Sequence, residues 1–377
     1  MEFVIERALF LNGLGMVQGI VERRNTVPIL GHVLLDANAT SLQLSATDLE
    51  VGLRTELPCE AAGKGSFTLS ARKLFEVVRE AEGDKVTLKS LDNDWIEIKC
   101  GRARFKMMGL DPRSFPAMPA QNAKADGARK GGVKASLKIA AEVLAALIDR
   151  TIFAVSPDEA RYNLSGVYIE SPEVGAVRMV ATDGHRLSLI DREAPGFTMQ
   201  GGSIIPRKGL TELRKLLDQA GDPDTELALD GNLAWLKRGR TEVSMRLVEG
   251  EFPDYRGVVP KESHYQIPVG RDILLSTIKR AAIFSNERYH GVKLDFTAGT
   301  LTVSSTSPEM GEASETVDID FNGTDFAVGF NAAYVQQVLN VITDGNVTLG
   351  LSDEVSPGVI TAESDSRFKY VVMPMRL

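Results

Sequence analysis

Apolar and polar residues alternate in the middle of the chain in a way that predicts a β-hairpin over residues 165–189. A turn rich in proline and glycine separates the two alternating runs, and the second run ends in Thr-Asp-Gly at residues 182–184. Two further hairpins with the same pattern begin at Gly31 and Gly291. Because the three hairpins lie at domain-sized spacing, the pattern predicts one domain repeated three times.

Helical patterns flank each predicted hairpin in the same order. One helix with a single apolar face precedes the hairpin, a second helix follows it, and alternating strands close the repeat. The first helices are expected at 7–21, 137–156 and 271–285, the second helices at 71–81, 206–220 and 331–342, and the closing strands at 85–108, 226–248 and 346–375. The fold class expected is α+β. The predicted domains are 1–126, 127–258 and 259–377.

Composition narrows the class of protein. The formal net charge of −8 argues against tight nucleic-acid binding through bulk charge, but basic pairs at 72–73 and 207–208 can still gather on one face. The two cysteines, Cys59 and Cys100, are too few for a disulfide framework or a zinc cluster. Nothing resembles a signal peptide or a membrane span, so a cytoplasmic location is expected.

Motifs for catalysis are missing from the sequence. It has neither the Gly-x-x-x-x-Gly-Lys-Ser/Thr loop that binds ATP nor the His-Glu-x-x-His of zinc proteases. Residues 70–73 match Ser-x-x-Lys, but the companion motifs of penicillin-recognising enzymes are absent, so this segment is interpreted as a helix start. Asp48 and Asp183 occupy equivalent repeat positions and are expected in turns. We therefore predict no catalytic residue, no metal and no cofactor.

Four motifs together resemble the bacterial sliding clamps, the β subunits of DNA polymerase III. They are Ala-Thr-Asp-Gly-His-Arg-Leu at 181–187, Pro-Arg-Lys-Gly at 206–209, Phe-Pro-Asp-Tyr-Arg at 252–256 and Val-Val-Met-Pro-Met-Arg-Leu at 371–377. The resemblance covers the whole chain. It implies three DNA-clamp domains per chain, each with two helices backed by two antiparallel sheets. It also implies a head-to-tail homodimeric ring that encircles duplex DNA without sequence preference. It also implies a processivity factor that performs no bond chemistry.

The resemblance assigns roles to individual residues. DNA contacts are expected at Arg24, Arg72, Lys73, Tyr162, Arg207 and Lys208. A pocket for partner peptides is expected from Leu164, Thr182, Gly184, His185, Arg186, Leu187, Pro253, Val258, Tyr289, Val371, Val372, Met373, Pro374, Met375, Arg376 and Leu377. Ring closure is expected to use Phe105 and Met107 against Ile283 and Phe284.

Three positions depart from the family pattern. Asp158 replaces an amide and is expected to repel phosphate. Gly257 replaces an arginine and removes a donor from the pocket, and Tyr289 replaces a phenylalanine and adds a hydroxyl group. The change at Gly257 is expected to alter which peptides bind.

Partners follow from the resemblance, and the residues alone leave alternatives open. The expected partners are the polymerase catalytic subunit, an ATP-dependent clamp loader, translesion polymerases and repair proteins, with no membrane. One alternative is an enzyme that uses His185 or Asp183 as acid or base, and another is a polymer-binding scaffold that does not close. The apolar run around Pro374 fits a core edge strand or a pocket wall equally well.

Overall fold

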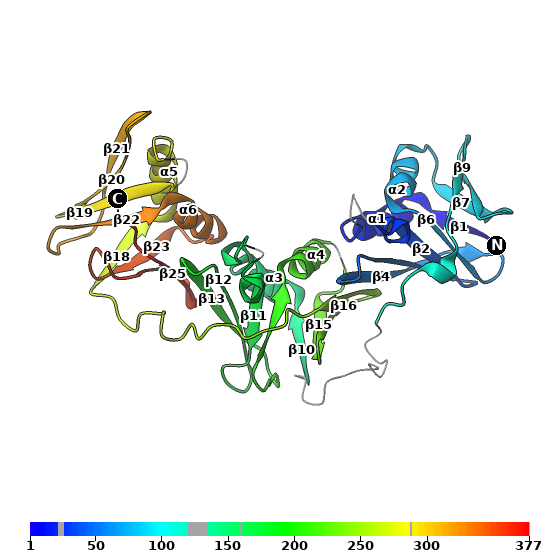
Figure 1. Ribbon diagram of the computed structural model, residues 1–377, viewed down its shortest axis with the longest axis horizontal. Coiled ribbons are helices and arrows are strands. Elements are labelled where there is room, and N and C mark those ends of the chain that lie inside the picture. Colours follow the sequence, from blue (N-terminus) through cyan, green and yellow to red (C-terminus); the bar gives the residue numbers. More distant parts are fainter. Residues whose placement is uncertain (22–25, 120–133, 159, 220, 287–288, 377) are drawn as a thin grey trace. The chain divides into compact units, whose positions relative to one another are not determined.

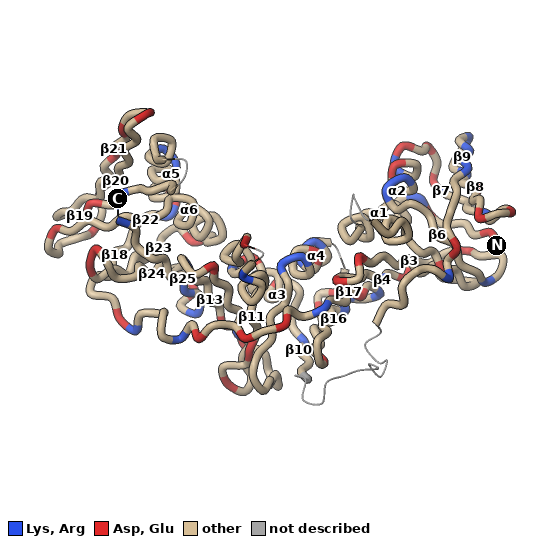
Figure 2. Tube along the Cα trace, viewed as in Figure 1, with Lys and Arg blue, Asp and Glu red and all other residues tan. Residues whose placement is uncertain are grey.

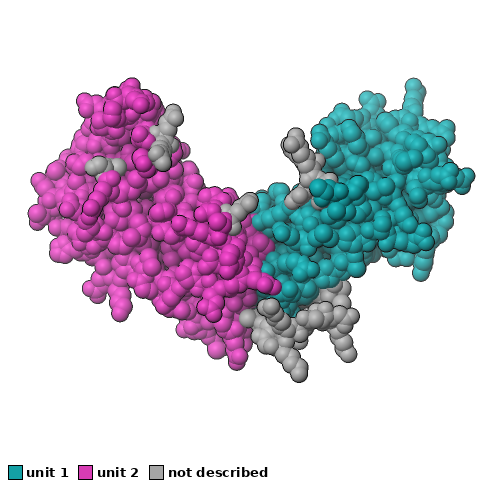
Figure 3. Space-filling model, in the orientation of Figure 1, with its two compact units in different colours: residues 1–144, 208–247 teal, residues 145–207, 248–377 magenta. Residues whose placement is uncertain are grey.

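The computed structural model describes residues 1–21, 26–119, 134–158, 160–219, 221–286 and 289–376. Contacts divide the chain into two compact units, one of residues 1–144 and 208–247 and one of residues 145–207 and 248–377 (Figure 3). No helix in these described ranges is long and apolar enough to cross a membrane. The three domain boundaries expected from the sequence stay a prediction.

Within the described residues, the first third of the chain has two α-helices and nine strands, and Figure 1 shows their arrangement. Its elements are β1 (Glu2–Glu6), α1 (Arg7–Gln18), β2 (His32–Ala37), β3 (Ser41–Thr47), β4 (Val51–Pro58), β5 (Glu60–Ala61), β6 (Gly65–Ser70), α2 (Ala71–Glu80), β7 (Lys85–Ser90), β8 (Trp95–Cys100) and β9 (Ala103–Met108). Helix α2 shows how the apolar pattern of the sequence produces a helix. Its buried residues Ala71, Leu74 and Val78 recur at helical spacing and form one apolar face.

The middle and last thirds repeat this order without the short strand β5. The middle elements are β10 (Lys134–Ala140), α3 (Ala141–Asp149), β11 (Gly166–Glu170), β12 (Ala176–Thr182), β13 (Arg186–Glu193), β14 (Gly202–Pro206), α4 (Arg207–Asp218), β15 (Asp224–Asp230), β16 (Leu233–Arg238) and β17 (Thr241–Arg246). The last are β18 (Tyr265–Gly270), α5 (Arg271–Ala282), β19 (Gly291–Thr297), β20 (Thr300–Ser307), β21 (Gly311–Asp318), β22 (Phe326–Asn331), α6 (Ala332–Val341), β23 (Asn346–Leu351), β24 (Gly358–Ala362) and β25 (Asp365–Val372). The predicted threefold repeat is confirmed.

The first helix of the middle repeat, α3 (Ala141–Asp149), begins later and ends earlier than expected. The sequence pattern placed a helix over 137–156, but residues up to Ala140 belong to strand β10. Leu137 and Ile139 are buried whereas Lys138 between them is exposed, and this period of two is that of a strand. In the same way Pro206 ends β14, and helix α4 begins at the next residue.

The described strands form four antiparallel sheets, and two of these sheets join successive repeats. One eight-stranded sheet has the order β10-β15-β16-β17-β4-β3-β2-β6, so β17 of the middle repeat pairs with β4 of the first. The other has the order β14-β11-β12-β13-β25-β24-β23-β18, so β25 of the last repeat pairs with β13 of the middle one. The remaining sheets, β5-β1-β7-β8-β9 and β21-β20-β19-β22, each end on a strand that has a single neighbour.

Candidate partner pocket

A cavity of about 270 Å³ opens beside the junction of β13 and β25. Its lining residues are Leu164, Thr182, Gly184, Arg186, Leu187, Pro253, Asp254, Tyr255, Val258, Val371 and Met373. All of them except Asp254 and Tyr255 are among the pocket residues predicted from the sequence. Asp254 and Tyr255 belong to the motif at 252–256, and this motif could have been used to predict them.

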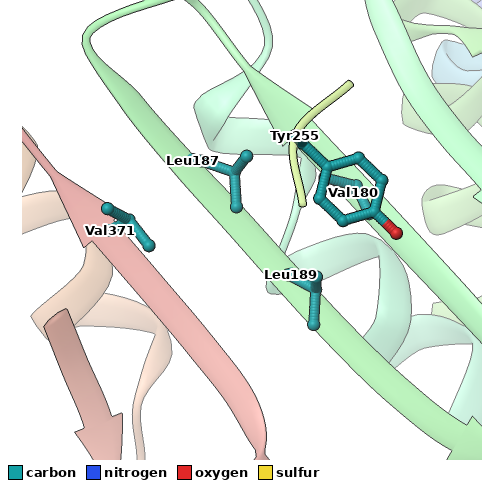
Figure 4. Close-up of a cluster of buried hydrophobic side chains, with 5 residues drawn as sticks. All are labelled: Val180, Leu187, Leu189, Tyr255 and Val371. Carbon is teal, nitrogen blue, oxygen red and sulfur yellow. The ribbon is translucent and has the colours of Figure 1, made fainter. Parts of the chain in front are cut away.

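Paired strands form the floor of the cavity. Leu187 of β13 lies opposite Val371 of β25, and the Met373 amide donates a hydrogen bond of 2.9 Å to the His185 carbonyl. Leu187 and Val371 are buried in a cluster with Val180, Leu189 and Tyr255 (Figure 4). Burial of this cluster holds the chain's last strand against the middle repeat and gives the cavity an apolar floor.

A tight turn brings residues 182–186 to the cavity. The Thr182 hydroxyl donates to the Arg186 carbonyl at 2.6 Å and accepts from the Gly184 amide at 3.1 Å. The Asp183 Oδ1 atom accepts from the amides of His185 and Arg186 at 2.9 and 3.1 Å. Gly184 has a φ of 89°, which glycine adopts without strain. The prediction that Asp183 is a turn residue is therefore confirmed.

The Arg186 guanidinium is buried and fully engaged. Its side chain is 6% exposed, and its Nε lies 3.1 Å from Asp183 Oδ2. Nη2 donates to the Phe153 carbonyl at 2.6 Å, Nη1 donates to Gln337 Oε1, and the group lies 4.4 Å from the centre of the Tyr334 ring. Because its donors already have partners within the chain, Arg186 fixes the shape of the floor. Burial, followed by the Asp183 charge, raises the pKa of Tyr334.

The structure does not bring every predicted pocket residue to the cavity. Among the described residues, the lining leaves out His185, Tyr289, Val372, Pro374, Met375 and Arg376. Val372 is buried, whereas Val371 and Met373 on either side of it line the cavity, as expected for alternate positions of an extended chain. The C-terminal run is thus partly core and partly cavity wall. Leu377 lies outside the described residues.

The residues predicted to contact DNA lie mainly on α2 and α4 (Figure 2). Arg72 and Lys73 are exposed, and both pair with Glu76 at 2.9 and 2.8 Å. Their hydrogen bonds hold the pKa of that carboxyl below its usual range. Lys208 pairs with Asp48 of the first repeat. Tyr162 and Arg207 are also exposed. Arg24 lies outside the described residues.

The residues predicted to close the ring come from two places. Phe105 and Met107 lie on the edge strand β9 and are half-buried. Ile283 is exposed and Phe284 is half-buried just after α5. Large apolar side chains thus remain partly uncovered at both places.

Comparison with known proteins places this fold among the sliding clamps. A crystal structure of the DNA polymerase sliding clamp from Pseudomonas aeruginosa with ligand superposes with a TM-score of 0.91 at 34% identity, over 100% of both chains. The clamp from Caulobacter crescentus gives a TM-score of 0.90 at 34% identity, again over 100% of both chains. The beta sliding clamp of Caulobacter vibrioides is 35% identical over 383 residues, covering 100% of each chain.

Family models match all three repeats. The N-terminal, central and C-terminal domain models of the DNA polymerase III beta subunit match residues 1–119, 138–254 and 256–376. The chain therefore belongs to the DNA polymerase III beta subunit family. Its function is that of a processivity factor for DNA replication, and it is not an enzyme. The alternative in which His185 or Asp183 acts as a catalytic acid or base is wrong.

Proposed function

We propose that two copies of this chain close head to tail into a ring around duplex DNA, and that the cavity beside β13 and β25 binds peptides of the replication proteins. The observation that carries this proposal is the repeated junction, in which the last strand of one repeat pairs with a hairpin strand of the repeat before it. A third junction of this kind would have to form between two copies of the chain.

The strand pairings between repeats support the proposal of a ring. Within the chain, β17 pairs with β4 and β25 pairs with β13. The equivalent strands without such a partner in the sheet order are β9 and β21, which lie at sheet edges. Pairing β9 of one copy with β21 of the other supplies two identical heterologous contacts and closes the assembly. Phe105 and Met107 then pack against Ile283 and Phe284.

The proposed DNA contacts are weak and independent of sequence. They come from Arg24, Arg72, Lys73, Tyr162, Arg207 and Lys208. Carboxylates offset part of this charge, because Glu76 and Asp48 pair with three of these cations. Asp158 lies 3.6 Å from Arg161, the residue before Tyr162, and offsets its charge. A ring that is held by enclosure needs only such weak phosphate contacts and can slide.

The proposed peptides carry apolar anchors. The floor is apolar, and Val258 and Met373 at the cavity are exposed. The sliding clamp of Pseudomonas aeruginosa and that of Bartonella birtlesii have been crystallised bound to griselimycin, and we propose that the same compound occupies this cavity. The partners are the polymerase catalytic subunit, an ATP-dependent clamp loader, translesion polymerases and repair proteins, all acting in the cytoplasm. Tethering raises the effective concentration of polymerase at the template.

Retention on nicked circular DNA tests the proposal. The protein is loaded with a clamp loader and ATP, and the circle is then linearised. We expect release on linearisation, and we expect retention when bulky groups block both DNA ends. A protein that stays on open linear DNA, or that never remains on the circle, contradicts enclosure.

A further inference from the structure

A buried carboxylate lies behind the cavity, outside its lining. Glu170 is the last residue of β11 and is 5% exposed. Its Oε1 accepts a hydrogen bond from the Tyr255 hydroxyl, and its Oε2 accepts one of 2.9 Å from Arg256 Nη2. A carboxylate is costly to bury unless it is paired. Both of its oxygens are engaged here by the segment 252–258, more than eighty residues further along the chain.

Tyr255 connects this carboxylate to the cavity. Its side chain is 3% exposed and packs with Val180, Leu187 and Val371 under the cavity floor. Figure 4 shows the ring among these side chains, with its hydroxyl directed away from Leu187 and Val371. One residue therefore has an apolar face in the cavity floor and a polar end held by Glu170.

The neighbouring charges complete the arrangement. Arg178 lies 3.2 Å from the Tyr255 hydroxyl and 3.9 Å from Glu170 Oε1, and it also makes two bonds of 2.6 Å to Asp191. The Arg256 guanidinium lies 5.3 Å from the centre of the Tyr255 ring. Burial raises the pKa of Tyr255 to about 12, so its hydroxyl keeps its proton at neutral pH.

A stacked aromatic pair holds the start of the same segment. Phe252 lies parallel to Tyr168 of β11, with ring centres 4.9 Å apart. Pro253, Asp254 and Val258, which follow it, line the cavity. The cavity wall is thus a stretch of chain without helix or strand that is tied to β11 at both Phe252 and Tyr255.

We propose that Glu170 is a positioning residue for this cavity. It holds residues 253–258 against the sheet through Tyr255 and Arg256, so that the wall is formed before a ligand arrives. The inference rests on the proposed function of the cavity as a binding site. A wall that is ordered in advance spares the ligand the entropy cost of ordering it, which raises affinity without any contact between Glu170 and the ligand.

Griselimycin binding to the full-length protein tests the inference by calorimetry. Glu170→Leu removes both acceptors, and we expect it to raise Kd about tenfold, the loss that comes from ordering one or two side chains on binding. Glu170→Gln keeps an acceptor for Tyr255 but loses the charge that holds Arg256, so we expect a smaller increase. Tyr255→Phe keeps the ring and removes the hydroxyl, so it tests the same link if Glu170→Leu does not fold.

Asp191→Leu is the matched control. It removes the carboxylate that bonds to Arg178, which also lies near Glu170. It leaves the two bonds from Tyr255 and Arg256 to Glu170 in place. We expect this control to lower Tm and leave Kd unchanged. Equal losses of affinity in both variants, or unchanged Kd in Glu170→Leu and Tyr255→Phe, would overturn the inference.

Hydrogen exchange gives a readout that needs no ligand. The Val258 amide donates to the Tyr255 carbonyl at 3.0 Å. We expect it to exchange faster in Glu170→Leu than in Asp191→Leu, and equal rates reject the positioning role. Failure of the natural protein to bind griselimycin instead counts against the cavity as that compound's site, whatever the exchange rates show.

Discussion

The turn at residues 47–51 and the turn at residues 182–186 are copies of one structure in different surroundings. In the first, the Thr47 hydroxyl donates to the Val51 carbonyl at 3.1 Å, and Asp48 Oδ1 accepts from the amides of Glu50 and Val51 at 2.9 and 2.6 Å. The second turn makes the same set of bonds through Thr182 and Asp183. Backbone geometry is thus common to both.

The two turns differ in what pairs with the second oxygen of the aspartate. Asp48 Oδ2 pairs with Lys208, whose side chain is 35% exposed. Asp183 Oδ2 pairs with Arg186, which is 6% exposed and is further bound by Phe153 and Gln337. The first pair is a partly solvated junction, and the second is a buried one next to the cavity. The turn is repeated with the same backbone bonds, and residues of the second turn line the cavity.

The largest expected effect comes from removing the buried cation. Arg186→Met leaves Asp183 without its counter-ion, and breaking a buried pair in this way costs about 3–5 kcal/mol. Because the chain has two compact units, local stability is the better-defined quantity. We expect amide exchange over residues 182–187 to speed up accordingly, as measured by mass spectrometry.

The matched variant in the first turn is Lys208→Met. The Asp48 side chain is 4% exposed, but its lysine partner is partly open to water, so we expect exchange over residues 47–52 to speed up less than exchange over residues 182–187. Equal effects in the two turns would show that burial of the counter-ion does not distinguish them.

Local patterns made most of the fold predictable. Helix α2 and the three hairpins follow from apolar spacing within a few residues, which is information the sequence carries directly. The segment from Leu137 to Ala140 was assigned wrongly because a short apolar run fits a strand or a helix equally well. That segment forms a strand because it pairs with β15, which begins more than eighty residues later.

The cavity was predictable only in part. Its motifs indicated most of the lining, because several of those residues are consecutive in sequence. The link from Glu170 to Tyr255 was not predictable, since the two residues are 85 positions apart and no local pattern connects them. Burial of the Arg186 side chain was not predictable either, because it depends on Gln337 of α6, which is distant in sequence.

A second, smaller effect is expected from the third position of each turn. Leu49 has a φ of 79° and its counterpart Gly184 a φ of 89°. A Cβ at Gly184 would lie 3.1 Å from Arg161 Nη1 and would also carry the strain of a positive φ. We expect Gly184→Leu to destabilise the second turn by about 2 kcal/mol. Faster exchange of the His185 and Arg186 amides measures this, and an unchanged rate would mean that the second turn tolerates leucine as the first turn does.

The smallest effect is a gain in stability at the first turn. Leu49 is 55% exposed, so its side chain gains little from burial while its backbone holds a positive φ. Leu49→Gly removes that strain but adds freedom to the unfolded chain, which leaves a net gain of about 0.5–1 kcal/mol. The two tryptophans of the sequence, Trp95 and Trp235, both lie in the unit that contains this turn, so their fluorescence during urea unfolding reports on it. Leu49→Ala keeps the strained backbone and should show no gain. If alanine stabilises as much as glycine, the exposed leucine side chain is the cause, and the backbone of the two turns is not under comparable constraint.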